Sequence, residues 1–521
     1  MEFAFFGAST SVGALFIFLE EEGYFVLKKH HIILLCSLGV LLIAIIVRLC
    51  ISFSSKPTTS TVEPTCTENG YTVYTYKDRT EIKDIVPALG HKFDEWNIVS
   101  EPMETVPGTR NHTCTVCGTN EEERYYSERS TARLLLYGSL DGIGKKSQVD
   151  LSAILEYDDL SFSGIAKLKH QGHSSLEFDK KNFTIKFYDE QDEKVYFEFS
   201  DWNSETKYVL KANYTDTSRS RNLISADIWS QIVSTRDTLH PRLEETSNLG
   251  AVDGFPIEVY HNDTFIGIYN LTLHKDDGLF GMKENSKDGI IISNGNLTAS
   301  TLFKECVDWE GDEEWEIEYS GLEDSTWIKT KTNEFISFVI NSSDEEFKNN
   351  LKNYADVDSL IDYLIAIYAL GLNEHYYHDV LFATYDNGPF IASLFDMESA
   401  FGLSEEEKSF ASASLGLPTV NGAEYSSGTD SLLWNRLISL FSEEITKRYM
   451  VLRDSVLSIE NVNAIIVARC ASIPESLNSA DLLLYPDQPL KDTDHKEQMQ
   501  SYFSERISLL DNIFGYKGEL K

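Results

Sequence analysis

The stretch LIDYLIAIYALGLNEHYYHDVLFATY, residues 360–385, passes from a helical pattern through an acidic loop into a β run. Its continuation SLFDMESAFG, residues 393–402, adds a second β run that ends in further acids. Carboxylates at the ends of hydrophobic strands could supply the one or two ligands that nucleotide-bound Mg²⁺ takes from a protein. Structural salt bridges explain the same acids equally well. A zinc site on His375 and His378 is a weaker alternative, because the HExxH spacing is missing.

The helix expected before this loop has one apolar stripe. Between Ala355 and Leu372 the stripe consists of Val357, Leu360, Ile361, Leu364, Ile367 and Tyr368. This spacing predicts a helix that packs one face against the core. Residues 431–457 repeat apolar positions at intervals of three and four, which predicts a packed helical scaffold.

The chain before the helix has the pattern of β structure. LSFSGIAKLKHQG at 160–172 and NFTIKFYD at 182–189 predict a hairpin with a basic loop. The basic side chains of this region are Lys167, Lys169, His170, His173, Lys180, Lys181 and Lys186. In so acidic a chain they favour a phosphate-bearing small molecule, and a solvated basic hairpin is the alternative. Residues 254–273 predict a second hairpin, which turns at residues 261–263.

A strand, a polar loop and a helix lie between the two hairpins. Tyr208 to Ala212 reads as the strand. The helix is expected to begin near Thr217, with Asp216 or Thr217 as its cap. Arg219 and Arg221 then fall in the first turns, where cations oppose the helix dipole. We therefore expect these arginines to meet an acid or a phosphate.

The composition limits the partners of this protein. Its 521 residues include 83 Asp and Glu against 45 Lys and Arg, which gives a formal net charge of −38. Binding to a phosphate backbone depends on Lys and Arg that displace counterions, so nucleic acid is not an expected partner. The seven Cys argue against a disulfide-framework protein. The acidic segment 301–330 is expected to be a solvated insertion.

The N-terminal region predicts a membrane anchor. IILLCSLGVLLIAIIV at 32–47 carries no charge, and its extension to Phe53 gives a transmembrane helix at 32–53. Lys28 and Lys29 precede this segment, so the charge bias places its start in the cytoplasm and the bulk of the chain outside. A cleaved signal peptide is the alternative to a retained anchor.

Residues 1–31 are expected to form a cytoplasmic or interfacial leader. Within it, the apolar run at 3–19 would either span the membrane weakly or lie in the interface. The protein is then a single-pass or a two-pass protein of the cell membrane. In both cases the region after the anchor stays extracellular.

A polar tether and a small β-rich module follow the anchor. Residues 54–62 carry Pro and Thr without periodicity, which indicates a linker. Residues 63–126 form the module and contain short β runs at 71–76 and 96–99, separated by Gly and Pro.

This module contains a candidate zinc site. The CTVCG motif places the thiols of Cys114 and Cys117 on one side of a tight turn. A tetrahedral Zn²⁺ site needs two more ligands, for which Cys66 and His91 are candidates together with His112. A reducible Cys pair or a disulfide in an exported module is the alternative.

The phrases PTCTENGYTVYTY at 64–76, ALGHKFDEW at 88–96 and HTCTVCG at 112–118 resemble a short repeat module. Such modules occur near membrane anchors and in surface proteins of Gram-positive bacteria. The resemblance covers about Glu63 to Tyr126 and implies a spacer or adhesion-type module on a bacterial surface. A position near Tyr76 that is often Cys in the module is not Cys here.

Five further blocks, in order, resemble the spore-coat protein H kinase family (CotH), an atypical secreted relative of the protein kinases. The resemblance runs from about Leu151 to Gly515. The blocks are KLKHQGHSSLEFDKKNFTIKF (167–187), YVLKANYTDTSRSRNLISADIW (208–229), DGFPIEVYHNDTFIGIYNL (253–271), the opening stretch with SLFDMESAFG, and LLWNRL (432–437) with RYMVLR (448–453).

This resemblance implies an α+β fold for residues 127–521, with the two lobes of an atypical protein kinase. The first lobe is β-rich and the second helical. It further implies ATP and Mg²⁺, or Mn²⁺, as cofactors. By position in the blocks, the nucleotide-binding residues are Lys180, Lys181, Arg221 and Asn222, and the metal ligands are Asp396, Glu398 and Asp379.

The catalytic loop departs from the family pattern. Similar proteins have an Asp in this loop and an Asn five positions later, where this chain has Glu374 and Asp379. With Glu374 and Asp396 as catalytic residues, the resemblance implies an extracellular kinase that transfers phosphate from ATP to Ser or Thr of a surface or secreted protein. The alternative is a catalytically degenerate domain that acts as a surface binding or structural module.

Overall fold

The structure is a computed structural model that describes residues 37–48, 56–128, 131–172, 174–199, 202–282, 289–310, 314–320, 326–404, 408–421, 424–426 and 429–518. The chain divides into two compact units. The small unit is Met1–Asn97 with Asn111–Glu122, and the large unit is Ile98–Arg110 with Glu123–Lys521.

Residues 37–48 form a helix within the predicted transmembrane segment 32–53. Its large apolar side chains, among them Leu41 and Ile45, are exposed. Across the described residues, we find no helix with the length and apolar character needed to cross a membrane. The rest of the predicted segment and the whole leader 1–31 lie outside the described residues, so the anchor remains a prediction.

The predicted β-rich module consists of short strands. One three-stranded sheet has the order β1-β2-β3, with β1 (Thr58–Val62), β2 (Gly70–Thr75) and β3 (Thr80–Val86). A second has the order β4-β5-β6, with β4 (Asn97–Ser100), β5 (Gly108–Thr113) and β6 (Asn120–Tyr125). The β runs expected at 71–76 and 96–99 coincide with β2 and β4, which confirms them.

Strands of the large unit close into a barrel of order β10-β11-β13-β12-β7-β8-β9. They are β7 (Ala132–Tyr137), β8 (Val149–Tyr157), β9 (Leu160–Gln171), β10 (Asn182–Tyr188), β11 (Lys207–Lys211), β12 (Gly254–His261) and β13 (Thr264–Leu273). Neighbours are antiparallel except β12 and β7, which run parallel. Closure leaves no unpaired edge.

Both predicted hairpins belong to this barrel. β9 pairs antiparallel with β10, with His170 opposite Phe183. β12 and β13 turn at Asn262 and Asp263, which have φ values of 48° and 62°. A tight two-residue hairpin turn of this kind needs positive φ at both central residues, which Asn and Asp tolerate. The hairpin predictions are therefore confirmed.

A four-stranded sheet of order β15-β14-β16-β17 follows the barrel. Its strands are β14 (Ile290–Asn294), β15 (Trp315–Ser320), β16 (Val380–Thr384) and β17 (Ile391–Leu394). The expectation that all of 301–330 is a solvated insertion is wrong, because β15 forms an edge of this sheet. Trp315 is buried and its ring centroid lies 6.4 Å from that of Phe382. Apolar residues alternate with acids along β15, whereas the expectation rested on the excess of acids over Lys in this segment.

Helices make up most of the remaining chain. The α-helices are α2 (Arg221–Ser234), α3 (Pro241–Glu244), α4 (Thr326–Asn341), α5 (Asp344–Asn350), α6 (Val357–Leu370), α7 (Leu432–Leu440), α8 (Ser442–Arg453), α9 (Ile459–Ala471), α10 (Glu475–Leu484) and α11 (His495–Phe514). Short two-stranded sheets pair β18 (Leu403–Ser404) with β19 (Ser409–Phe410) and β20 (Thr419–Asn421) with β21 (Glu424–Ser426).

Helix α6 lies where the sequence predicts it. It begins after Asp356, whose side chain accepts a hydrogen bond from Ser359 N, and ends at Gly371 with φ 73°. The predicted single apolar stripe is too narrow, because every residue from Ser359 to Leu370 is buried. The helix is covered by α2, α8, α11 and β17 on its different sides.

Helix α2 begins at Arg221, later than the expected start near Thr217. Asp216 nevertheless serves the helix start, since one carboxylate oxygen accepts from Ser220 N at 3.1 Å and Arg221 N at 3.0 Å. The loop between β11 and α2 thus stays outside the helix and is tied to it by Asp216.

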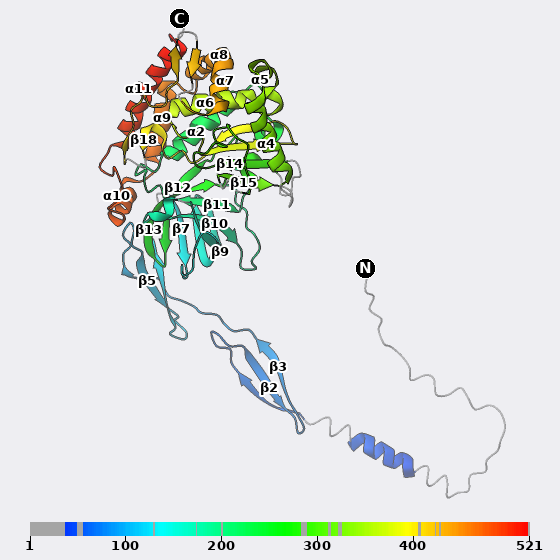
Figure 1. Cartoon of the computed structure of the whole chain (residues 1–521). Coiled ribbons are helices and arrows are strands. Elements are labelled where there is room, and N and C mark those ends of the chain that lie inside the picture. The colour runs from blue at the N-terminus through cyan, green and yellow to red at the C-terminus, as the bar shows by residue number, and fades with distance from the viewer. Residues whose placement is uncertain are drawn as a thin grey trace, which may run out of the picture. The chain divides into compact units, whose positions relative to one another are not determined.

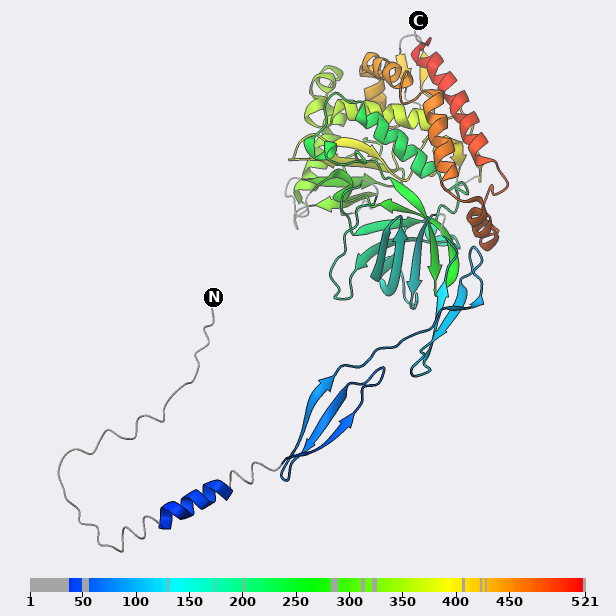
Figure 2. The same ribbon diagram turned by 180° about the vertical axis from the view of Figure 1, so that it is seen from behind.

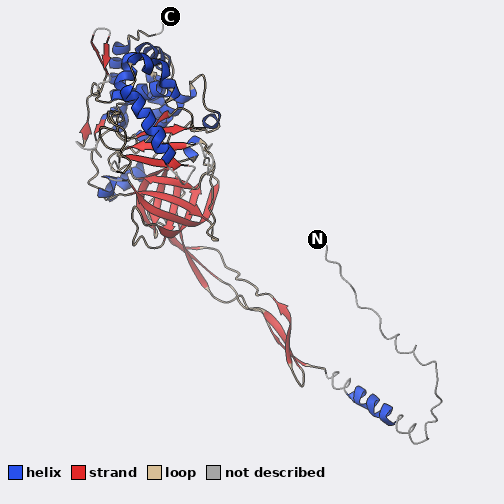
Figure 3. Ribbon diagram, turned by 45° about the vertical axis from the view of Figure 1, so that its right-hand side comes forward, coloured by secondary structure: helices blue, strands red, loops and turns tan. Residues whose placement is uncertain are grey.

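In the large unit, the barrel lies at one end and most of the helices at the other, with the four-stranded sheet between them (Figure 1). The view from behind and the view coloured by secondary structure show the same order (Figures 2 and 3). The expected α+β class, with a β-rich part followed by a helical part, is confirmed. The two-lobe kinase architecture remains a prediction.

Candidate functional site

The site is centred on an ion pair between two distant elements. Asp396 follows the end of β17 and has a φ of 52°. Lys211 is the last residue of β11 in the barrel. Its Nζ lies 2.6 Å from Asp396 Oδ1. The predicted metal ligand Asp396 therefore faces a barrel lysine that the sequence interpretation did not select.

A hydrogen bond from α2 holds the turn that carries Asp396. Asn222 Oδ1 accepts from Met397 N at 2.7 Å. Asn222 Nδ2 donates to Asn213 Oδ1 at 3.4 Å. Asn222, predicted to bind nucleotide, is buried, and it contacts Met397, the residue that follows Asp396. In the structure it positions the backbone next to the carboxylate.

The charges around this ion pair reinforce it. Burial alone would lower the pKa of Lys211, but the charges of Asp396, Glu398 and Asp379 raise it above its ordinary value. Burial opposes ionisation of Asp396, yet the charge and hydrogen bond of Lys211 and the charge of Lys275 lower the pKa of that carboxyl. Both partners are therefore ionised at neutral pH.

A second carboxylate lies at the start of β16. Asp379 has a φ of 58°, and its backbone N donates to Asn294 O at 3.1 Å. Val380 N donates to Asn294 Oδ1 at 2.9 Å, so the end of β14 fixes this turn. Asp379 Oδ2 lies 2.5 Å from His378 Nδ1, and this hydrogen bond raises the pKa of His378.

The two other predicted loop residues differ in exposure. His375 is buried, and its Nε2 donates to Phe395 O at 3.0 Å. Its Nδ1 has no hydrogen-bond partner in the described part of the chain. Glu374 is exposed in the turn, and its charge acts on His378.

A second lysine flanks the site from the segment after β13. Lys275 Nζ lies 2.6 Å from Glu318 Oε1 and 4.3 Å from the ring centre of Phe395, the residue before Asp396. Glu318 comes from β15, the strand that the sequence interpretation took for part of an insertion. The site therefore includes two lysines, Lys211 and Lys275, on the side of the barrel and β15.

The predicted phosphate lysines have other partners. Lys180 is buried, and its Nζ donates to Asp481 Oδ2 at 2.6 Å and to Ile268 O. Lys181 Nζ donates to Leu176 O at 2.7 Å and to Phe178 O. Neither is joined to Asp396 by a hydrogen bond or ion pair among the described residues.

Arg221 also meets a carboxylate. It is buried, pairs with Asp216 and donates to Gln498 Oε1 at 2.7 Å. Its Nε donates to Ala400 O at 3.1 Å, in the segment after Asp396. Arg219 likewise pairs with Asp481. The arginines were expected to meet an acid or a phosphate, and in the structure each meets an acid.

The predicted metal ligands do not form a compact donor set by themselves. Over the described residues, one group of at least three His, Cys, Asp or Glu side chains has its ligand atoms close together. That group is Cys66, His91, Cys114 and Cys117 of the small unit. Asp379, Asp396 and Glu398 are instead related through their charges on Lys211.

The arrangement around Asp396 still suits a cation bound to a nucleotide. Asp396 Oδ1 accepts from Lys211, while Oδ2 has no hydrogen-bond partner in the described residues and the side chain is 37% exposed. Mg²⁺ with bound phosphates needs only one or two protein carboxylates. The carboxylate of such an ion pair can bind a metal, and its lysine can bind a phosphate oxygen.

Lys211 carries a weak signal in the sequence. It ends the apolar strand KYVLK, in which a charged residue has no role in the barrel core. Lys275 stands two residues after the end of β13 and shows no comparable pattern. Only the long-range contacts identify both lysines.

Comparisons with known proteins agree with the blocks that carry the resemblance. The family model described as CotH kinase protein matches residues 168–509, which is more than half of the chain. The comparison with curated proteins gives no match. The matched residues include β10, β11, α2 and both strands around Asp379 and Asp396. This chain belongs to the CotH kinase protein family.

Proposed function

We propose that the large unit is a phosphotransferase that moves the terminal phosphate of ATP to a Ser or Thr hydroxyl of a surface or secreted protein. The observation that supports this most directly is the Lys211–Asp396 ion pair of 2.6 Å in a chain of the CotH kinase family. Such a pair provides a cation for phosphate oxygens and a carboxylate for a metal, which are the two charges that phosphoryl transfer needs.

In this proposal the nucleotide phosphates are bound by Lys211, in place of the sequence-predicted Lys180 and Lys181. Lys211 lies in the site with a side chain that is 12% exposed, whereas Lys180 is fully buried against Asp481. When a phosphate is present, Lys211 would share its charge between that phosphate and Asp396. Lys275 would support the same negative charge from its place over Phe395.

Asp396 would hold Mg²⁺ or Mn²⁺ through the oxygen that Lys211 leaves open. The metal supplies charge neutralisation of the phosphates. Asp379 and Glu398 remain candidate second ligands, since both carboxylates act on Lys211. Asn222 would act as a positioning residue, because it fixes the backbone at Met397.

The proton of the acceptor hydroxyl has two candidate bases. Glu374, the predicted base, is exposed in the loop. We propose His378 as the second candidate, because its Nδ1 is hydrogen-bonded to Asp379 and its Nε2 is the other ring nitrogen. A carboxylate that orients a histidine in this way is a common arrangement for a general base.

The predicted location completes the proposal. The apolar helix 37–48 would be part of a membrane anchor, because its exposed Leu and Ile side chains suit lipid. The large unit would then act outside the cell, as a surface protein of a bacterium. The proposal of a spore-coat setting rests only on the name of the family.

A second candidate function is a surface binding or structural module that has lost catalysis. One observation favours it, namely that both residues of the catalytic loop differ from the family pattern, as Glu374 and Asp379. Such a module would keep the fold of the large unit and bind a ligand without phosphate transfer.

The test uses the full chain in detergent with γ-labelled ATP, Mg²⁺ or Mn²⁺, and a mixture of surface proteins. We expect labelled protein with the natural sequence and a loss of at least ~100-fold in Lys211→Met and Asp396→Asn. Lys447→Met and Asp487→Asn, which change exposed residues, are the matched controls and should keep the label. Equal labelling in all five proteins refutes the proposal, whereas metal-dependent ATP binding without labelling favours the binding module.

A further inference from the structure

The small unit has almost no hydrophobic core. Its described residues bury only Cys66, Gly70 and Cys114. Apolar side chains such as Ile82, Ile85 and Leu89 are 58%, 64% and 64% exposed. A domain of this size that buries so little needs a disulfide or a metal to hold its chain together.

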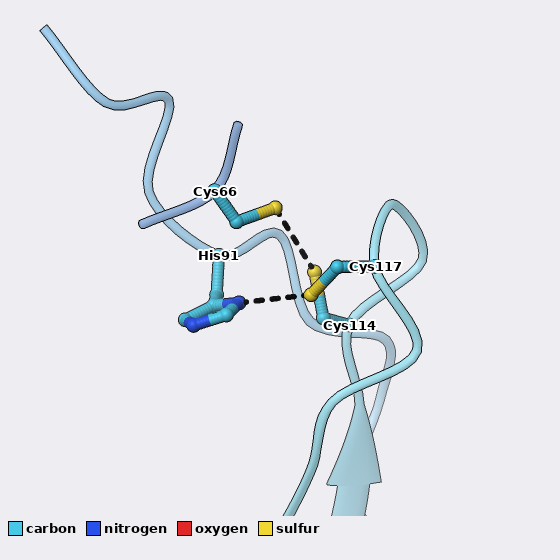
Figure 4. A group of neighbouring side chains, drawn as sticks. All are labelled: Cys66, His91, Cys114 and Cys117. Carbon is cyan, nitrogen blue, oxygen red and sulfur yellow. Dashed lines mark hydrogen bonds between the residues drawn. The ribbon is translucent and has the colours of Figure 1, made fainter. Parts of the chain in front are cut away.

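The two buried side chains belong to a group of four potential ligands. Cys66 Sγ, His91, Cys114 Sγ and Cys117 Sγ each offer a ligand atom, and these atoms lie within 4.8 Å of one another. Figure 4 shows the three thiols and the imidazole turned toward a common centre. The four residues come from three separate loops, and every one lies in the small unit.

The distances match a tetrahedral metal site. Cys66 Sγ and Cys114 Sγ are 3.8 Å apart, and Cys117 Sγ is 3.3 Å from His91 Nδ1. With zinc–sulfur bonds of about 2.3 Å, two thiolates on one tetrahedron are about 3.8 Å apart. The cysteines of this group are free thiols in the structure. Three thiols and one imidazole in such proximity suit one metal better than one disulfide.

The CxxC loop has the backbone of a metal-binding turn. Cys114 N donates to Thr119 O at 2.8 Å, and Gly118 N donates to Cys114 O at 2.9 Å. Gly118 has a φ of 75°, which a residue with a side chain rarely adopts. This tight turn brings Cys117 back beside Cys114.

Polar groups around the sulfurs suit thiolates. Lys92 N donates to Cys114 Sγ at 3.4 Å. Cys117 Sγ lies 3.1 Å from the hydroxyl of Thr119, which can donate to it. Hydrogen bonds of this kind from outside the ligand set orient metal ligands and stabilise their charge.

The other two ligands are held by a second pair of loops. Gly90 N donates to Cys66 O at 3.0 Å, and Leu89 N donates to Thr65 O at 2.9 Å. Thr115 N donates to Lys92 O at 2.8 Å, which ties the His91 segment to the CxxC turn. These backbone hydrogen bonds link the three segments that carry the four ligands.

His112 is not part of the group. Its ring stacks between Phe93 at 4.0 Å and Trp96 at 3.6 Å. Its Nε2 lies 3.4 Å from Glu121. Phe93 also lies beside His91, with the two ring centroids 5.3 Å apart.

We propose that Cys66, His91, Cys114 and Cys117 bind one structural Zn²⁺ that holds the small unit folded. Three soft thiolates with one imidazole select zinc over Mg²⁺ or Ca²⁺, which take oxygen ligands. Four protein ligands fill the tetrahedron and leave no open position for a substrate. The ion therefore has a structural role, independent of the phosphotransferase proposed for the large unit.

Zinc content of the full chain in detergent tests this proposal. We expect one equivalent of zinc in the natural sequence and in Cys306→Ser, a matched control at an exposed cysteine of the large unit. Cys114→Ser and His91→Ala should each lose most of it. Zinc absent from the natural sequence, or retained in full by Cys114→Ser, overturns the proposal. Asp396→Asn should keep the zinc, which separates this outcome from the kinase test.

Two further measurements do not depend on a variant that folds. Replacement of the ion by Co²⁺ should give the visible absorption of a tetrahedral thiolate site. A chelator should expose residues 63–97 to proteolysis while the large unit stays intact. A disulfide between Cys66 and either CxxC cysteine in a non-reducing peptide map refutes the zinc site, as does cleavage that the chelator leaves unchanged.

Discussion

Replacement of Lys180 by Met should destabilise the large unit and leave nucleotide binding intact. Lys180 Nζ and both oxygens of Asp481 are fully buried. Asp481 Oδ2 also accepts from Ile268 N at 2.7 Å, and Arg219 holds Oδ1. Burial lowers the pKa of Lys180 against the effect of Asp481, so the lysine depends on this partner to stay charged.

The size of the loss follows from what remains after the change. A hydrogen bond to a buried charge contributes about 1.5–3 kcal/mol, and Asp481 keeps Arg219 and Ile268 N when Lys180 becomes Met. We therefore expect Lys180→Met to lower the free energy of unfolding by about 2 kcal/mol. Asp481→Leu leaves the buried cations Lys180 and Arg219 without their acid, so it should lower the free energy of unfolding by about 3–5 kcal/mol.

Calorimetry of the full chain and equilibrium binding of an ATP analogue with Mg²⁺ are the assays. Lys180→Met should unfold at a lower temperature and bind the analogue as the natural sequence does. Lys211→Met should unfold at the natural temperature, because its partner Asp396 is 37% exposed and can be hydrated. It should bind the ATP analogue more weakly than the natural sequence does. If Lys180→Met binds no nucleotide yet unfolds at the natural temperature, then Lys180 contacts the phosphates and the reasoning from burial fails.

Three other changes test separate parts of the structure. Burial and the neighbouring charges of Asp276 and Asp277 raise the pKa of Glu205 to about 8, so the folded chain keeps a proton there that the unfolded chain loses above pH 4.5. The contribution of Glu205 to stability therefore falls as pH rises from 4.5 to 8. Glu205→Gln should unfold at a higher temperature than the natural sequence at pH 8 but not at pH 4, whereas Glu190→Gln, at an exposed position, should match the natural sequence at both pH values. Asn222→Ala removes the acceptor of Met397 N and should slow phosphate transfer by ~10–100-fold in steady-state assays, while Asn341→Ala, at the exposed end of α4, should not. The double change Glu374→Asp with Asp379→Asn should raise transfer if the loop exchanges limit it, and a fall in rate shows that the natural pair is adapted to its own geometry.

Local patterns predicted the parts of the fold that local physics decides. The hairpin turn at Asn262 and Asp263 follows from residues that accept positive φ. The apolar positions between Ala355 and Leu372 predicted the helix that the structure shows as α6, Val357–Leu370. The burial of α6 on all sides could not be read from its own sequence, because elements distant in the chain, α2, β17, α8 and α11, pack around it.

The candidate site was predictable only in its acidic half. Asp396 and Asp379 were selected because acids at strand ends form a pattern within the stretch 360–402. The lysine that faces Asp396 is 185 positions away, and no periodicity relates the two. The pairing of Lys180 with Asp481 spans 301 positions, and it could not be predicted from the sequence for the same reason.

The basic residues of the matched blocks show why residue type and spacing were insufficient to assign roles. Lys180, Arg219 and Arg221 are buried, and each has a buried acid within hydrogen-bond distance, so their charges are already neutralised inside the fold. An incoming phosphate would have to displace a buried carboxylate, which costs several kcal/mol. Lys211 differs because its acid is partly exposed, and in the proposed function Asp396 would turn to a metal when a phosphate takes its place beside Lys211. If the proposed function is correct, the exposure of the partner carboxylate, more than the lysine itself, separates a structural cation from one that binds a nucleotide.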